Sequence, residues 1–212
     1  MEKVQPSSEV PLHVAAVHEE LKVPLFAPLL SPPTSFTWVE DVMCTCKGPI
    51  TMRNVSFLDT LNLGFVLNVT GGVLSDEDEP SSVTEALDSQ GIRVVVSSPP
   101  STMTELSSWV NATLELLLEQ MLHYEKDKKT LLIVGNEKTY WDCVLFACFR
   151  RLQSWSVVSA LGEFRQQLGP PSIARRTFEL EQFIEAFEPG RIDMTHTPRI
   201  IETYRRLMVR LH

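Results

Sequence analysis

Residues 130–155 combine an apolar run, a short polar loop and a helix pattern, and this order of elements can build a site for a phosphate group. The run at 131–134 is short enough for a buried parallel strand, and residues 135–140 show no hydrophobic periodicity. The helix pattern that follows has apolar residues at Val144, Leu145, Cys148 and Leu152. In such a loop, backbone N–H groups converge on an anion and the helix dipole adds positive potential.

The length and register of this loop resemble the signature of the cysteine-dependent phosphatases. In that signature a strand ends in His-Cys, and five residues separate the Cys from an Arg that is followed by Ser or Thr. The resemblance is closest to the atypical dual-specificity phosphatases related to inositol pyrophosphate phosphatases and the oxidant-induced cell-cycle-arrest proteins. The corresponding segment here is Val134, Gly135, Asn136, Glu137, Lys138, Thr139, Tyr140, Trp141 and Asp142.

In this register the residues at the two key positions do not match the chemistry that the resemblance implies. The family reaction needs a thiolate nucleophile, but the Cys position holds Gly135, which has no side chain. It also needs a guanidinium that grips phosphoryl oxygens, but the Arg position holds the uncharged Trp141. Glu137 and Asp142 oppose an anion, and Lys138 is the only cation within the loop. We therefore predict a degenerate loop that holds no phosphate, with the Trp141 indole in part of the phosphate's space.

A third chemical role is missing from residues 97–104, the segment where this family carries its general acid. Breaking a phosphate ester or anhydride requires a carboxylic acid that protonates the leaving group. Residues 97–104 contain no Asp, Glu or His, and Glu105 is expected to belong to the following helix. The nucleophile, the phosphate-gripping Arg and the general acid are thus lost at three separate places, which predicts that no catalytic residues remain.

The four cysteines offer neither a replacement nucleophile nor a metal site. Cys143 falls in the first turn of the helix after the loop, so we expect its sulfur to point away from the loop's centre. Cys44 and Cys46 are too close for a usual zinc knuckle, and no second Cys or His pair has matching spacing. We expect all four, including Cys148, to be buried structural thiols, and we predict no metal and no other cofactor.

The resemblance implies the cysteine-phosphatase fold, an α/β architecture whose central, mostly parallel sheet of four or five strands is flanked by helices. The alternation of strand and helix patterns along the chain supports this class independently. We expect the first strand at residues 38–43. We also expect Val158 and Phe178 to face inward on two of the helices that follow the signature loop.

The chain is predicted to comprise a flexible N-terminal arm at residues 1–25, a phosphatase-like domain at 26–190 and a C-terminal helical extension at 191–212. Residues 198–211 of the extension show an amphipathic helix pattern. Its apolar face can pack on the domain itself, or it can bind a partner groove or a membrane surface. The candidate partner-binding residues on this helix are Arg199, Arg205, Arg206 and Arg210.

The composition narrows the classes of partner and the compartment. A net charge of −8 and a pI of about 5.2 argue against general binding to nucleic acid or to anionic membranes. No apolar run reaches the roughly 20 residues of a membrane-spanning helix, and residues 1–20 do not have the pattern of a signal peptide. We therefore expect a cytoplasmic protein, with a nuclear location also open.

Three functions are compatible with these residues. The first is a pseudophosphatase that acts as a non-catalytic binding, scaffold or regulatory subunit for protein partners, with related phosphatase-like subunits among the candidates. The second is a pseudoenzyme that still binds an anion such as an inositol phosphate, although a small-molecule ligand is not the expectation. The third is an active phosphatase with relocated catalytic residues. The fold alone does not decide among them.

Overall fold

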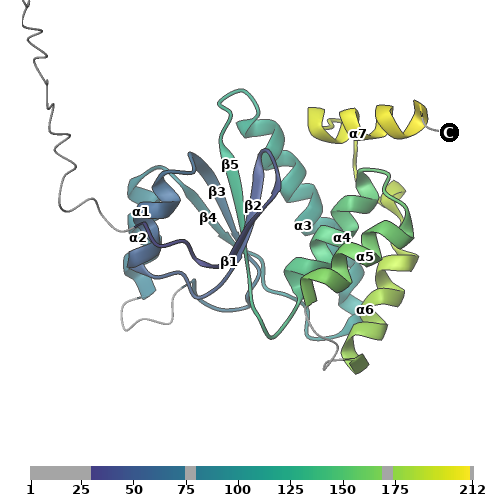
Figure 1. The fold of residues 1–212 in the computed structure, drawn as a ribbon, viewed down its shortest axis with the longest axis horizontal. Coiled ribbons are helices and arrows are strands. Elements are labelled where there is room, and N and C mark those ends of the chain that lie inside the picture. Colours follow the sequence, from purple (N-terminus) through teal and green to yellow (C-terminus); the bar gives the residue numbers. More distant parts are fainter. Residues whose placement is uncertain (1–29, 75–79, 169–173, 211–212) are drawn as a thin grey trace, which may run out of the picture.

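The computed structural model describes residues 30–74, 80–168 and 174–210, which form an α/β unit around one five-stranded sheet (Figure 1). The edge strand β1 pairs antiparallel with β2, and all other neighbouring strands are parallel. The predicted fold class is confirmed. The strands, in their order across the sheet, are β1 (Thr34–Glu40), β2 (Met43–Lys47), β5 (Thr130–Gly135), β3 (Leu63–Asn68) and β4 (Arg93–Val96).

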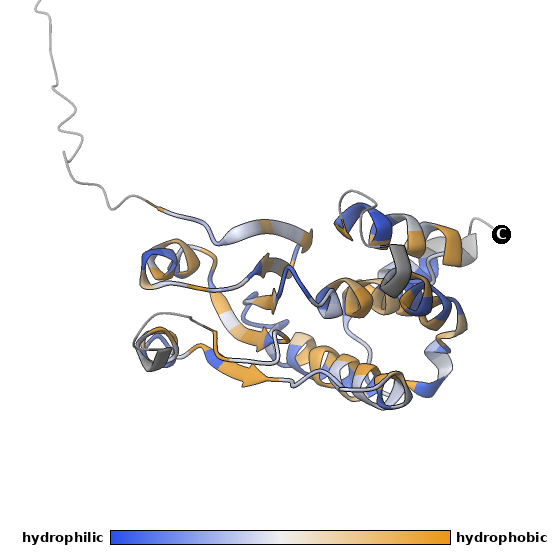
Figure 2. Ribbon diagram, turned by 90° about the horizontal axis from the view of Figure 1, so that it is seen from below, coloured by the Kyte–Doolittle hydropathy of each residue, from blue (hydrophilic) through white to orange (hydrophobic). Residues whose placement is uncertain are grey.

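Helices cover both faces of the sheet, each over its own hydrophobic cluster (Figures 1 and 2). On one face lie α1 (Met52–Asp59) and α2 (Pro80–Ser89). On the other face lie α3 (Met103–Tyr124) and α4 (Trp141–Leu152), and α4 also contacts α5 (Val157–Leu168) and α6 (Ala174–Ala186). This layering buries the central strands on both sides.

Strand β5 illustrates why its sequence is a continuous apolar run. Leu131 and Ile133 belong to the cluster under α3 and α4, whereas Leu132 and Val134 belong to the cluster under α1 and α2. Successive side chains of a strand point to opposite faces, and here each face is covered by helices. All six residues of the strand are therefore buried.

Three local expectations were wrong. The segment expected as one strand at 38–43 is split by a turn between the end of β1 and the start of β2. Val158 is 81% exposed and Phe178 is 60% exposed. The buried side chains of α6 include Leu180 and Ile184 instead, because Phe178 lies on the opposite side of that helix at about 100° per residue.

The C-terminal helix α7 (Arg199–Arg210) follows the 3-10 turn η1 (Pro189–Arg191), and side chains of its first half contact the rest of the fold. Ile201 is fully buried within the cluster under α3 and α4. The Tyr204 hydroxyl donates to Glu40 Oε2 at 3.3 Å, and Arg205 Nε donates to the Leu152 carbonyl at 3.3 Å. The described half of the helix therefore packs on its own domain. The predicted domain boundaries stay predictions, and the N-terminal arm lies outside the described residues.

A buried arginine network links β1, α4, α5 and α7. The Arg150 guanidinium is ion-paired with Glu40 and with Glu163, and it stacks at 4.4 Å on the Trp155 ring. Burial lowers the pKa of Arg150, but the hydrogen bonds and charges of Glu163 and Glu40 outweigh burial and raise it. Because Glu40 also accepts the Tyr204 hydrogen bond, this network fixes α7 to the edge of the sheet.

Candidate functional site

The signature loop leaves the sheet at the end of its middle strand, β5. The Val69 N–H donates to the Val134 carbonyl at 2.9 Å, and the Gly48 N–H donates to the Gly135 carbonyl at 2.8 Å. These bonds extend the pairing of β5 with its two neighbours to the last residue before the loop. Tyr140 then adopts a left-handed backbone, with φ of 55°, and α4 begins at Trp141. The strand, loop and helix expected from the sequence are therefore present.

The carboxyl group of Asp142 lies directly against Gly135. A Cβ atom added to Gly135 would lie closer than 3.0 Å to all three carboxyl atoms of Asp142, a separation that real Cβ atoms do not show. The Asp142 side chain is almost completely buried. A side chain at position 135 and the observed Asp142 carboxyl group therefore cannot occupy this space together. The side chain that lies against Gly135 is that of Asp142. The expectation that the Trp141 indole takes part of the phosphate's space stays a prediction.

A lysine from the neighbouring strand holds this carboxylate. Lys47, the last residue of β2, pairs with Asp142 Oδ2, and its Nζ lies 3.6 Å from Cys143 Sγ. Burial lowers the pKa of Lys47, but the charge of Asp142 and the contacts with Asp142 and Cys143 outweigh burial and raise it. Lys47 is thus a cation at neutral pH, and its charge is neutralised by Asp142 inside the loop.

Cys143 lies beside this ion pair rather than apart from it. The thiol is buried, and burial together with the negative charge of Asp142 raises its pKa to about 12, although Lys47 acts in the opposite direction. At neutral pH this group is therefore a thiol and not a thiolate. The other three cysteines are also buried and free, as expected. Within the described residues, no three His, Cys, Asp or Glu side chains are grouped to hold a metal.

A hollow of about 290 Å³ lies between the signature loop, the segment at 97–104 and α6. Trp141 lines it, and its ring packs edge-to-face on Trp109 of α3 with the centroids 5.8 Å apart. Among the described residues of the lining, Glu179 of α6 is the only carboxylate, and it is exposed. Glu105 lies in the first turn of α3, as expected. Sequence reasoning did not single out Glu179, because Phe178 beside it was assigned to the core.

The remaining loop residues lie at the surface. Glu137 and Lys138 are exposed, while Asn136, Thr139 and Tyr140 are half-buried. The Lys138 N–H donates to Asn136 Oδ1 at 2.8 Å, which closes a tight turn at the start of the loop. The hydroxyl of Thr139 is buried and makes no hydrogen bond within the described structure. The loop is thus polar outside and contains an ion pair inside.

The candidate partner-binding arginines do not form one uniform patch. Arg199 and Arg206 are exposed, with side chains that are 89% and 78% accessible. Arg206 pairs with Glu202 of the same helix at 3.0 Å, and Arg199 lies 4.0 Å from Glu125. Arg205 is bonded to the Leu152 carbonyl, and the side chain of Arg210 lies outside the described residues. Among the four candidate arginines, Arg199 and Arg206 are therefore the ones whose described side chains are accessible to solvent.

Lys47 is the functional residue that sequence reasoning missed. The loop itself contains one cation, Lys138, whereas Lys47 lies 88 residues before the start of the loop in the sequence. The pairing of β2 with β5 places Lys47 opposite Gly135. A correct assignment of β2 as a parallel neighbour of the signature strand would have given this signal, because the carboxyl ends of parallel strands meet at one edge of the sheet.

Comparison with known proteins identifies the family. The chain matches the Tyrosine phosphatase family over residues 30–202, which is most of its length. This protein belongs to the tyrosine phosphatase family. It is 28% identical over 166 residues to an Arabidopsis thaliana protein, inositol diphosphatase DSP3, and the match covers 76% of this chain and 73% of that protein. Family membership confirms the resemblance read from the sequence.

Solved structures support the fold of this tyrosine phosphatase family member. The core catalytic domain of the PP-IP phosphatase SIW14 from S. cerevisiae, in complex with citrate, matches with a TM-score of 0.60 at 24% identity, covering 76% of this chain and 90% of that chain. P. aeruginosa TpbA in complex with pTyr matches with a TM-score of 0.53 at 16% identity, covering 80% and 94%. Among the helices that the structure describes, none has the length and apolar content that a membrane crossing needs.

Proposed function

We propose that this protein is a pseudophosphatase, a member of the tyrosine phosphatase family that hydrolyses no phosphate ester or anhydride and serves as a binding or scaffold subunit. The observation that carries the proposal is the position of the Asp142 carboxyl group. It fills the space next to Gly135 from which a nucleophilic side chain would project, and Lys47 holds it there. A phosphoryl group at this place would meet a carboxylate instead of a thiolate and a guanidinium.

The state of Cys143 argues against a relocated nucleophile. Phosphoryl transfer to cysteine requires the thiolate, and a pKa raised to about 12 leaves the Cys143 thiol protonated at neutral pH. Its nearest cation, Lys47, is already paired with Asp142. Within the described part of the chain, the segment at 97–104 supplies no carboxylic acid, and Glu179 across the hollow is exposed. The protonated thiol and the missing general acid together support the proposed absence of phosphate hydrolysis.

The scaffold role is supported by α7, which combines a buried anchor with exposed cations. Ile201 and Tyr204 attach the helix to the domain, and Arg199 and Arg206 remain accessible to solvent. Exposed arginines on a rigid element favour an acidic protein partner through charge complementarity. The proposed partner is therefore a protein with an acidic docking surface, and a related phosphatase-like subunit is one candidate. Its binding should weaken as salt rises.

Hydrolysis assays at high enzyme concentration test the proposal. We expect no phosphate release above buffer from p-nitrophenyl phosphate, from a phosphotyrosyl peptide or from a diphosphoinositol phosphate. The diagnostic variant is Cys143→Ser, which removes the one cysteine that contacts the loop's ion pair. Turnover by the purified chain that is lost in Cys143→Ser would establish a relocated nucleophile and refute the proposal. Turnover that persists in this variant and follows the protein through purification would refute it as well.

A further inference from the structure

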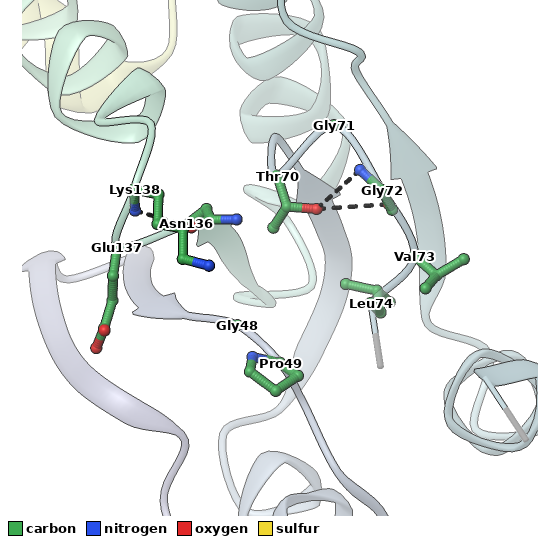
Figure 3. Close-up of a pocket in the computed structure, with 10 residues that line it drawn as sticks. All are labelled: Gly48, Pro49, Thr70, Gly71, Gly72, Val73, Leu74, Asn136, Glu137 and Lys138. Atoms are coloured by element: carbon green, nitrogen blue, oxygen red, sulfur yellow. Dashed lines mark hydrogen bonds between the residues drawn. The ribbon is translucent and has the colours of Figure 1, made fainter. Parts of the chain in front are cut away.

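A second hollow lies between the start of the signature loop, the segment after β2 and the turn after β3. Its volume is about 470 Å³, which is within the range of ligand sites in proteins. Figure 3 shows the loop residues on one wall and the turn after β3 on the other, with Pro49 between them. The lining is formed by Gly48, Pro49, Thr70, Gly71, Gly72, Val73, Leu74, Asn136, Glu137 and Lys138.

The topology of the sheet creates this hollow. The chain leaves β2 and β3 toward α1 and α2 on one face, whereas it leaves β5 toward α4 on the other face. The outgoing segments therefore diverge at the carboxyl ends of these three neighbouring strands. In open α/β sheets, ligands bind in the crevice at such a switch point.

Both walls are held in place by asparagine side chains. Asn68 is fully buried at the end of β3, where it accepts the Thr70 N–H at 2.9 Å and donates to the Gly72 carbonyl at 2.8 Å. On the other wall, Asn136 Oδ1 accepts the Lys138 N–H. A buried polar side chain stabilises a structure only when its hydrogen bonds are made. These two asparagines satisfy local backbone groups and thereby preorganise the walls.

The polar groups directed into the hollow are hydrogen-bond donors. With its Oδ1 engaged by the turn, Asn136 presents its amide nitrogen, and Figure 3 shows this nitrogen and the Lys138 side chain directed toward the wall that carries Thr70. The Glu137 carboxylate points away from that wall. The remaining lining includes the apolar residues Pro49, Val73 and Leu74. One cation, one amide donor and an apolar wall suit a small anion with an apolar part.

We propose that this hollow binds a small organic monocarboxylate. One carboxylate oxygen pairs with Lys138 Nζ, the other accepts from Asn136 Nδ2, and the organic part packs on Pro49 and Leu74. A polyphosphate fits less well, because the site offers a single cation, Glu137 lies beside it and the chain carries a net charge of −8. This site goes beyond the proposed scaffold function, does not require catalysis, and departs from the expectation that no small molecule binds.

Titrations with acetate, benzoate and 3-phenylpropionate, followed by amide chemical shifts of the full chain, test the site. We expect saturable binding of the two aromatic acids, with amide shifts confined to residues 48, 70–74 and 136–138, and weaker binding of acetate. Benzamide and inorganic phosphate should bind more weakly than benzoate. Absence of saturable binding by all three acids, or equal binding of benzamide and benzoate, or tighter binding of phosphate, would each overturn the proposal.

Three variants locate the binding groups. Asn136→Asp keeps the oxygen that accepts the Lys138 N–H but replaces the amide donor by a carboxylate, so affinity for benzoate should fall at least about fivefold. Lys138→Met should cause a similar loss. Lys126→Met, which removes an equal charge at the opposite end of β5, should leave affinity unchanged. Equal affinity for benzoate in all three variants would overturn the proposal. Phosphatase turnover would refute the proposed pseudophosphatase function but would leave the proposed carboxylate site unaffected.

Discussion

The Asp142 carboxyl group occupies the space that a side chain at position 135 would need. The carboxyl group fits only because position 135 has no Cβ. The Lys47 ion pair is buried, so either partner alone would be costly to leave there. The loop is therefore built around a buried pair of charges, and the position of the Asp142 carboxyl group depends on the glycine.

A double-mutant cycle measures this dependence. Gly135→Ala should lower the free energy of unfolding by about 1–3 kcal/mol through overpacking against Asp142. In an Asp142→Ala background, Gly135→Ala should lower the free energy of unfolding much less. Urea denaturation should therefore give a coupling energy of about 1–3 kcal/mol between the two positions. Gly162→Ala on α5 is the matched control, because its added Cβ meets no atom, and it should stabilise slightly. Equal costs of Gly135→Ala in both backgrounds would show that the two side chains do not compete.

At the scale of elements, α7 is held to the domain by the buried Ile201 and by hydrogen bonds from Tyr204 to Glu40 and from Arg205 to the Leu152 carbonyl. Tyr204 reaches the same carboxylate that pairs with Arg150, so the helix joins a network which already connects β1 with α4 and α5. This arrangement favours self-packing over a free amphipathic helix, the alternative that the sequence left open. The arginines that point to solvent are then available without loss of stability.

Separating these two roles requires two kinds of variant. Ile201→Ala should lower the free energy of unfolding by about 2–4 kcal/mol, because a fully buried side chain is truncated, and deletion of residues 197–212 should lower the melting temperature further. The double charge reversal Arg199→Glu and Arg206→Glu should leave melting nearly unchanged and weaken capture of an acidic partner. If the deletion leaves the melting temperature unchanged, self-packing of α7 is wrong.

The limits of sequence reasoning are also visible in particular elements. Strand β5 was predictable because burial on both faces makes its sequence uniformly apolar. Strand β2, with the sequence MCTCK, is also buried but has no such run. Its sequence therefore gave no local sign that it is a parallel neighbour of β5. Missing β2 meant missing Lys47. On α5 the periodicity was found and only Val158 was wrong, since Val157 packs on the core and Val158, about 100° further round, faces solvent.

Over the whole molecule, four buried thiols make stability depend on alkaline pH. Burial raises the pKa of Cys44 and Cys143 from 9.0 to about 12, and it raises those of Cys46 and Cys148 as well. These groups stay protonated in the folded chain while their unfolded counterparts ionise. The stabilisation is therefore fully present below pH 9 and is lost as the pH rises from 9 toward 12.

The expected loss is large enough to measure by urea denaturation. At pH 10 each thiol should contribute a loss of about 1.4 kcal/mol, so the urea midpoint should fall steeply between pH 8 and pH 10. Replacing Cys46 and Cys148 by Ala should lower stability at neutral pH but reduce this pH dependence by about half. A midpoint that stays constant up to pH 10 would contradict burial of the thiols in the folded chain.

The most direct test of the degenerate loop is a crystal of the full chain soaked with tungstate, an analogue of phosphate whose position is visible by anomalous scattering. We predict no tungsten among the backbone amides of residues 135–141, and an Asp142 carboxyl group that remains beside Gly135 and paired with Lys47. Tungstate bound by those amides, with Asp142 displaced, would show that the loop still accepts a phosphoryl group and would contradict the account.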